Sequence, residues 1–231
     1  MFVDREKITI NSFLNFAVLR YEDNVYHHIL KKGDQENLYT LIQKAEGINL
    51  FVGYYEKRKN FKVLMLTADV NLIKSDWEVK KHLEDPNHIF YFIHSTIDKP
   101  NFHDLLIDYC YSNKITLTYS FLEISENIQE SQNNDKIQIA NYYSAGYPPL
   151  LVVENGNYHL PLRGGIPLGI VNFIPKKQTL EIPFEAKIFV HTPINEKIHN
   201  IREFHYDIAK NNLDKIPQDI LLFEFYYSGH A

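Results

Sequence analysis

The sequence contains a single cysteine, Cys110, among its 231 residues, and one cysteine cannot form an internal disulfide framework. A chain of this length can bury a full hydrophobic core without disulfides or a structural metal. A lone thiol is typical of proteins kept in a reducing compartment. We therefore expect a cytoplasmic protein in which Cys110 belongs to the core rather than acting as a nucleophile.

Long apolar runs and an excess of positive charge are also absent. No stretch approaches the roughly 18 consecutive apolar residues that a membrane-spanning helix needs, and the first residues lack the apolar region of a signal peptide. The 24 Lys and Arg are outnumbered by 29 Asp and Glu, which gives a net charge of -5. This balance disfavours nucleic acids and acidic membranes, so we predict neither as a partner.

Aromatic residues are plentiful, with 16 Tyr and 15 Phe against one Trp and two Met, and this composition favours β-strands over a helical bundle. Two apolar runs, 48–55 and 61–67, flank a polar turn and predict a hairpin. A second hairpin is predicted where residues 150–153 and 158–162 surround Asn155-Gly156, because Asn-Gly fits a type I′ turn.

Helical spacing of apolar residues predicts two helices, one over 73–84 and one around Phe102 to Tyr109. Several sequential hairpins with few helices indicate an α+β sandwich. The remaining predicted segments are strands over 114–123, 186–191 and 220–227, a polar loop over 125–135 and a helical region over 196–212.

Two motifs together resemble a known family. Ala145-Gly146-Tyr147-Pro148-Pro149 ends a predicted strand, and Gly165-Ile166-Pro167-Leu168-Gly169 follows the Asn-Gly hairpin. The bacterial metal-dependent protein phosphatases of the stage II sporulation protein E type, relatives of protein phosphatase type 2C, have a strand ending in Ala-Gly-His-Pro-Pro. In that family a hairpin and a Gly-x-Pro-Leu-Gly turn follow. The chain is therefore similar to this family across its second half.

The resemblance extends over residues 45–227. Asp69-Val70 matches a Gly-Asp-Val motif, the Leu105-Leu106 segment matches a family helix, and Gln218-Asp219-Ile220 resembles Asp-Asp-Ile-Thr. The resemblance implies two stacked antiparallel β-sheets flanked by helices, an αββα sandwich. We expect residues 45–231 to form one phosphatase-like domain, with residues 1–44 as N-terminal strands or an extension packed on it.

The family holds two divalent cations with a small set of carboxylates, and hard cations such as Mg²⁺ and Mn²⁺ need several such anionic ligands. The resemblance assigns the four ligand positions to Gly53, Asp69, Pro193 and Gln218, so that Asp69 alone retains a carboxylate. Asp219 is offset by one residue and would point to the opposite face of an extended segment. We therefore predict a pseudophosphatase with no catalytic residue, no metal and no other cofactor.

Such a domain would act in bacterial signalling by binding a protein, either a phosphorylated regulator or a second copy of the chain as a homodimer. One alternative is a weak metal-dependent serine/threonine phosphatase that uses Mn²⁺ or Mg²⁺ with altered ligands. A one-metal version of that site would draw on Glu56, Asp69, Glu185 and Asp219. Another alternative is a small-ligand module that reuses the same cleft.

Four residues are candidates for the cleft itself: Glu56, Tyr147, His191 and Asp219. Two of them also have a structural interpretation. Tyr147 stands where the family has His and can fill space, in which case its buried phenol needs a partner. His191 can be a buried histidine at the end of a strand. Asp69 can likewise serve as a hydrogen-bonding residue at a strand end.

Overall fold

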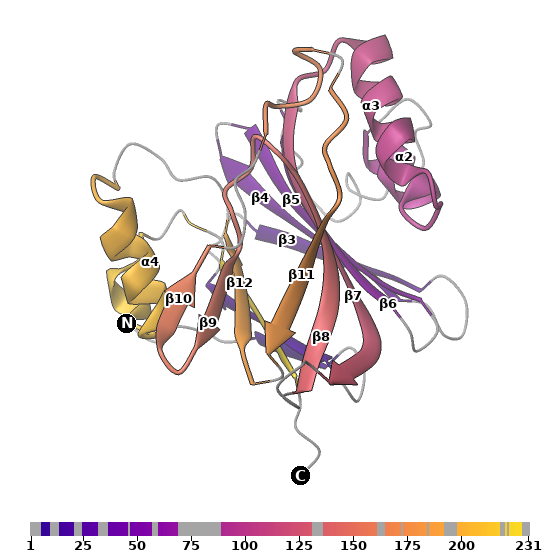
Figure 1. The fold of residues 1–231 in the computed structure, drawn as a ribbon. Helices are drawn as coiled ribbons and strands as arrows, with labels where there is room; N and C mark the ends of the chain where they lie inside the picture. The colour runs from indigo at the N-terminus through magenta and orange to yellow at the C-terminus, as the bar shows by residue number, and fades with distance from the viewer. Residues whose placement is uncertain are drawn as a thin grey trace.

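The structure is a computed structural model, and it describes residues 6–9, 14–20, 25–31, 37–45, 47–56, 60–68, 89–130, 136–160, 165–171, 173–183, 185–191, 198–217, 220 and 222–227. Within these residues, two antiparallel sheets are stacked with helices on their outer sides (Figure 1). No helix in the described part of the chain is long and apolar enough to cross a membrane. The predicted α+β sandwich is confirmed.

The first sheet, sheet A, contains in spatial order β1 (Glu6–Thr9), β2 (Leu14–Arg20), β13 (Leu222–Tyr227), β12 (Lys187–His191), β9 (Leu151–Glu154) and β10 (Asn157–His159). Sheet B contains β11 (Gln178–Pro183), β8 (Lys136–Ala145), β7 (Leu117–Glu130), β6 (Asn60–Ala68), β5 (Gly47–Glu56), β4 (Asn37–Ala45) and β3 (Val25–Lys31). The described helices are α2 (Ile89–Thr96), α3 (Phe102–Asn113), α4 (Ile201–Ala209) and the short η1 (Leu213–Lys215).

Both predicted hairpins are present, as β5–β6 and β9–β10. At the tip of the second hairpin, Asn155 has φ 51° and Gly156 has φ 72°, the left-handed pair that a type I′ turn requires. The predicted helix around Phe102 to Tyr109 is α3, and the predicted final strand is β13. The predicted helix over 73–84 lies outside the described residues.

The predicted polar loop over 125–135 is wrong in its first half, because β7 continues to Glu130. A register shift between Ile124 and Ile128 lets these polar residues pair with the start of β8. A bulge of this kind lets a strand continue past a break in the ladder. Helix α2 was not predicted, since its apolar residues form a continuous run that does not distinguish a helix from a buried strand.

The strands before residue 45 belong to the same two sheets as the rest of the chain. Strand β2 pairs with β13 in sheet A, and β4 pairs with β5 in sheet B. The expected boundary between residues 44 and 45 therefore falls inside β4 rather than between two structural units.

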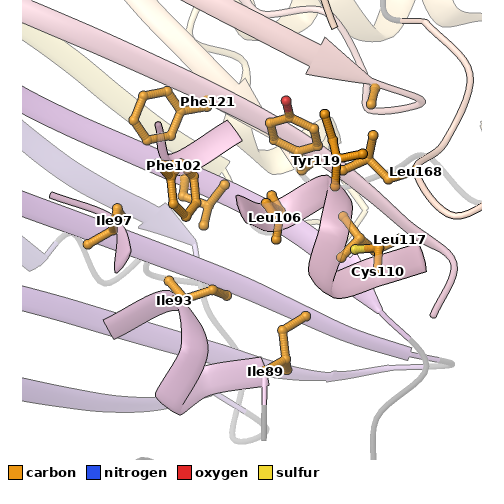
Figure 2. Close-up of a cluster of buried hydrophobic side chains, with 13 residues drawn as sticks. Ile89, Ile93, Ile97, Phe102, Leu106, Cys110, Leu117, Tyr119, Phe121 and Leu168 are labelled. Carbon is orange, nitrogen blue, oxygen red and sulfur yellow. The ribbon is translucent and has the colours of Figure 1, made fainter. Parts of the chain in front are cut away.

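Helices α2 and α3 cover the outer face of sheet B, and their contact is a core of buried apolar side chains (Figure 2). Along β7, Tyr119 and Phe121 face these helices, so the alternate residues Ser120 and Leu122 face sheet A. Cys110 of α3 lies in this core, and desolvation raises the pKa of its thiol to about 12. The core role expected for Cys110 is confirmed.

Helix α4 covers the outer face of sheet A. The side chain of Asn200 caps its N-terminus by accepting hydrogen bonds from the backbone N–H groups of Arg202 (3.2 Å) and Glu203 (3.3 Å). The apolar side chains between α4, η1 and the sheet are Leu151, Val153, Phe189, Phe204, Ile208, Ile216, Ile220 and Leu222.

Substituting Gly169 tests how closely the 165–171 segment lies against the start of β7. Gly169 has φ +84°, and a Cβ atom on it would lie 2.0 Å from the carbonyl oxygen of Ile115. We expect Gly169→Ala to lower the free energy of unfolding by about 3 kcal/mol, because backbone strain adds to a clash that no side-chain rotation relieves. Urea denaturation measures this loss.

The matched control is Gly156→Ala in the β9–β10 turn. Gly156 also has a left-handed φ, +72°, but its nearest neighbour is the flexible end of Lys210 at 3.1 Å. We expect a loss of only about 1 kcal/mol there. Equal losses in the two variants would contradict the close backbone contact at Gly169.

His103 of α3 is held between the helix and sheet B. Its Nδ1 atom lies 3.2 Å from the hydroxyl oxygen of Tyr119, and its ring stacks on that of Tyr143 with 3.7 Å between centroids. Burial, reinforced by the positive charge of Lys62, lowers the pKa of His103 from 6.5 to about 4. The imidazole is therefore neutral when the protein is folded at neutral pH.

This pKa predicts how stability changes in acid. Below pH 6.5 the unfolded chain takes up a proton at His103 that the folded chain does not bind until about pH 4. The contribution of His103 to the free energy of unfolding should therefore be constant above pH 6.5 and fall below it, by up to about 1.4 kcal/mol per pH unit. Urea titrations between pH 7.5 and pH 4.5 test this, and His103→Phe should reduce the slope. An unchanged slope in the variant would contradict the assignment to His103.

Candidate functional site

Strand ends from both sheets meet at one end of the sandwich. In sheet B, Ala68 at the end of β6 pairs with Leu117 at the start of β7. Strand β8 ends nearby, and the short connection 146–150 carries the chain from it to the start of β9 in sheet A. There, the end of β12 at His191 pairs with Leu222 at the start of β13. We call this end of the sandwich the site end.

The site end is where the chain leads into three of the four ligand positions that the family resemblance assigned. Asp69 follows β6, Pro193 follows β12 by two residues, and Gln218 precedes β13. These residues and Asp219 lie outside the described residues. The structure therefore brings together the strand ends that flank them.

Gly53 and Glu56 are not brought to the site end. Gly53 is opposite Val63 in the β5–β6 pair, roughly 20 Å of extended strand from the residue after Ala68. Glu56 pairs with Asn60 beside the hairpin turn, at the other end of β6. The backbone opposite the end of β6 is instead Ile48 at the start of β5. The position of the turn in the sequence already fixes this register and could have shown it.

The two motifs that carry the family resemblance pack against each other. The N–H of Gly146 donates a hydrogen bond of 2.7 Å to the carbonyl of Gly165. Gly146 has φ +66°, and a Cβ on it would lie 2.6 Å from the Cγ atom of Pro167. The strand end in sheet B and the turn after the β9–β10 hairpin therefore form one compact structure at the site end.

Tyr147, a candidate cleft residue, is only 3% exposed. Its backbone carbonyl accepts a hydrogen bond from Ser144 Oγ at 3.4 Å. The burial agrees with the interpretation of Tyr147 as a space-filling residue and leaves little of its side chain accessible to a ligand.

His191 faces α4 on the outer side of sheet A. It is 1% exposed, its ring packs edge-on against Phe204 with 5.1 Å between centroids, and the ring of His205 lies 5.7 Å away. His205 is buried as well, and desolvation lowers its pKa. This placement contradicts a role for His191 between the sheets and agrees with a buried histidine at a strand end.

The space between the sheets contains a cluster of hydroxyl groups that the sequence reasoning missed. Ser120 Oγ donates a hydrogen bond of 3.4 Å to the hydroxyl oxygen of Tyr142, and Ser144 is opposite Ser120 in the β7–β8 pair. Burial raises the pKa of Tyr142, despite hydrogen bonds with Ser120, Ser144 and the backbone of Leu150. The signal in the sequence was serine at inward positions of two apolar strands. These groups are neutral and so unlike the ligands of a divalent cation.

Buried carboxylates in the described residues lie outside the space between the sheets. Asp207 of α4 accepts a hydrogen bond from Asn212 Nδ2 (2.9 Å) and lies 3.5 Å from Lys215 Nζ. Glu224 lies 2.6 Å from Lys187 Nζ and is opposite Phe189, on the sheet face covered by α4.

The one-metal grouping of Glu56, Asp69, Glu185 and Asp219 is also not assembled by the described residues. Glu185 is exposed and precedes the start of β12, whose other end reaches the site end. The part of the chain that the structure describes contains no group of three or more His, Cys, Asp or Glu side chains that could hold a metal.

No family model and no curated protein matches this sequence. Among solved structures, RsbX in complex with magnesium is similar with a TM-score of 0.53 and 14% identity, over 97% of this chain and all of RsbX. The RsbU and RsbW domains of Rv1364c from Mycobacterium tuberculosis are similar with a TM-score of 0.52 and 12% identity, over 95% of this chain and 63% of that one.

The PP2C phosphatase domain of SpoIIE from Bacillus subtilis, solved with a fragment of its regulatory domain, is similar with a TM-score of 0.50 and 9% identity, over 93% of this chain and 62% of that one. At these identities the likeness concerns the fold. Together with the two packed motifs and the αββα layers, it confirms the resemblance stated from the sequence: this chain has the PP2C-like fold of the stage II sporulation protein E-type phosphatases.

Proposed function

We propose that this chain is a catalytically inactive phosphatase-like domain that acts in bacterial signalling by binding a protein. The proposal rests on which residues stand at the site end. Strands β12 and β13 meet there, and the sequence supplies Pro193 and Gln218 beside them where the family resemblance implies carboxylates. A pair of hard divalent cations needs several anionic oxygen ligands to be held between the sheets.

The described groups between the sheets support the same conclusion. The side chains of Ser120, Tyr142 and Ser144 hydrogen-bond or pack there as neutral hydroxyls. A hydroxyl is a weak substitute for a carboxylate because it brings no charge to offset that of the cation. Asp69 is then the only one of the four assigned positions with a negative charge, and one carboxylate is too few for a two-metal reaction.

The second candidate is a metal-dependent phosphatase with altered ligands, using Mn²⁺ or Mg²⁺. One specific observation favours it. Ala68 at the end of β6 is paired with Ile48 near the start of β5, so the chain enters β5 and leaves β6 at the same end of this hairpin. Glu46 immediately precedes β5 in the sequence, and Asp69 immediately follows β6. This candidate would therefore use Glu46 and Asp69, rather than a ligand at Gly53.

The proposed partner is a protein, either a phosphorylated regulator or a second copy of the chain. We propose that binding takes place in the cytoplasm. Two features support this: the lone buried Cys110 fits a reducing compartment, and the net charge of -5 disfavours nucleic acid.

A calorimetric titration with Mn²⁺ separates the two candidates. We expect no binding up to the millimolar range for the wild type, Asp69→Asn and Glu46→Gln, and no Mn²⁺-dependent hydrolysis of p-nitrophenyl phosphate. The physical reason is the shortage of anionic ligands. Asp104→Asn is the control for non-specific surface binding, because Asp104 is an exposed acid on α3.

Micromolar binding that Asp69→Asn or Glu46→Gln removes and Asp104→Asn retains, together with Mn²⁺-dependent hydrolysis, would refute the inactive domain. It would also establish the altered-ligand phosphatase.

A further inference from the structure

The segment between β10 and β11 exposes an unusual number of branched aliphatic side chains. Ile166, Ile170, Val171 and Ile174 are 51%, 59%, 47% and 62% exposed, respectively. We call these four side chains the 165–174 patch. Exposed apolar side chains gathered in one short segment mark an interaction site more often than single scattered ones do.

The backbone beneath the patch is fixed. Leu168 is fully buried, and its N–H and C=O groups exchange hydrogen bonds with Leu117 at 2.9 and 3.2 Å. The ring of Phe173 lies within 3.1 Å of a Cβ built on Gly165, which holds the end of the segment beside its beginning. The backbone that carries the exposed side chains is therefore already ordered. Binding of a partner then costs little conformational entropy in this segment.

The patch lies at the site end of the molecule. The hydrogen bond between Gly146 and Gly165 joins it to the connection between the sheets, and Gly169 lies against the backbone of Ile115 after α3. In Figure 1 the chain leading into β11 runs beside the end of α3 that leads into β7. A protein seated on the patch would thus cover the same end of the sandwich that the family resemblance assigns to the metal site.

The sequence around the patch is rich in positive charge, unlike the chain as a whole. From residue 155 to residue 180 the sequence contains no Asp or Glu, but it contains Arg163, Lys176 and Lys177, in a chain whose net charge is -5. Lys176 and Lys177 are exposed, and so is Lys114 in the turn against which Gly169 packs. An apolar centre with cations around it complements an apolar surface with anions around it.

Two other occupants are disfavoured by these observations. A two-fold contact through the patch would bring together two copies of a segment that carries lysines and no Asp or Glu between residues 155 and 180. A membrane-inserting loop presents projecting aromatic and leucine side chains, whereas these are isoleucine and valine about half covered by their own domain.

We propose that the 165–174 patch is the docking surface for an acidic protein segment, one in which apolar side chains are flanked by carboxylates. This proposal rests on the proposed function, since it names the surface and the partner chemistry of a domain that acts by binding. The apolar side chains of the partner bury against the patch, while its carboxylates approach Lys176, Lys177 and Lys114.

The test is selection from a phage-displayed library of random peptides on the immobilised protein at low salt. We expect the enriched peptides to combine Asp or Glu with aliphatic or aromatic residues, and their binding to weaken as salt rises. Ile170→Ser should weaken the best peptide about tenfold or more. The double variant Lys176→Glu/Lys177→Glu should select peptides with Lys or Arg instead.

The matched control is Tyr206→Ser, which removes a side chain that is 51% exposed on α4, away from the patch, and should leave peptide binding unchanged. Enriched peptides without acidic residues would overturn the proposal, as would equal affinity for Ile170→Ser. Co-sedimentation of the wild type, but not of Ile170→Ser, with phosphatidylserine–phosphatidylcholine vesicles would overturn it in favour of a membrane surface.

The Mn²⁺ titration and hydrolysis assay report on the inactive domain independently of the peptide selection. Catalysis with acidic-peptide binding would refute the proposed function and leave the patch as a docking surface of an enzyme. Absence of both catalysis and acidic peptides would retain the inactive domain and reject the patch.

Discussion

The close backbone contact between Gly146 and Gly165 is the interaction on which the site end of this molecule depends. It joins the strand that leaves sheet B to the turn that follows the β9–β10 hairpin of sheet A. The same turn is anchored to the first residue of β7 by the paired hydrogen bonds between Leu117 and Leu168. Glycine is favoured at position 146 because its φ of +66° is left-handed and a Cβ atom there would lie 2.6 Å from the Cγ atom of Pro167.

These backbone contacts hold the site end together without any of the residues assigned as metal ligands. The strands that precede or follow the assigned ligand positions are present, and their ends meet at the site end of the sandwich. The family resemblance assigns three of the ligands to residues just beyond those ends in the sequence, outside the strands themselves. A chain can therefore lose the carboxylates and retain the fold, and the activity has to be argued from the site rather than from the architecture.

Three histidines packed between helices and sheets show the same separation of fold from chemistry on the outer faces of the sandwich. His103 packs between α3 and sheet B, while His191 and His205 meet between sheet A and α4. Burial lowers the pKa of His103 and of His205, so both imidazoles are neutral at physiological pH. Their contacts are those of core residues that link helices to sheets. A position at the end of a strand, as for His191, is therefore no indication of a catalytic or binding role.

The sequence by itself determined those features that depend on neighbours along the chain. The Asn155-Gly156 turn, the apolar face of α3 and the order of hairpins that makes an α+β sandwich were predicted because local backbone geometry and periodicity govern them. The tertiary structure alone decided which face of sheet A His191 occupies, that β7 continues past Ile124 through a register shift, and that Ile48 rather than Gly53 is opposite the end of β6. These outcomes depend on pairing between distant segments, where a shift of one residue reverses the face of every side chain and a shift along the ladder moves a residue from one end of the sheet to the other.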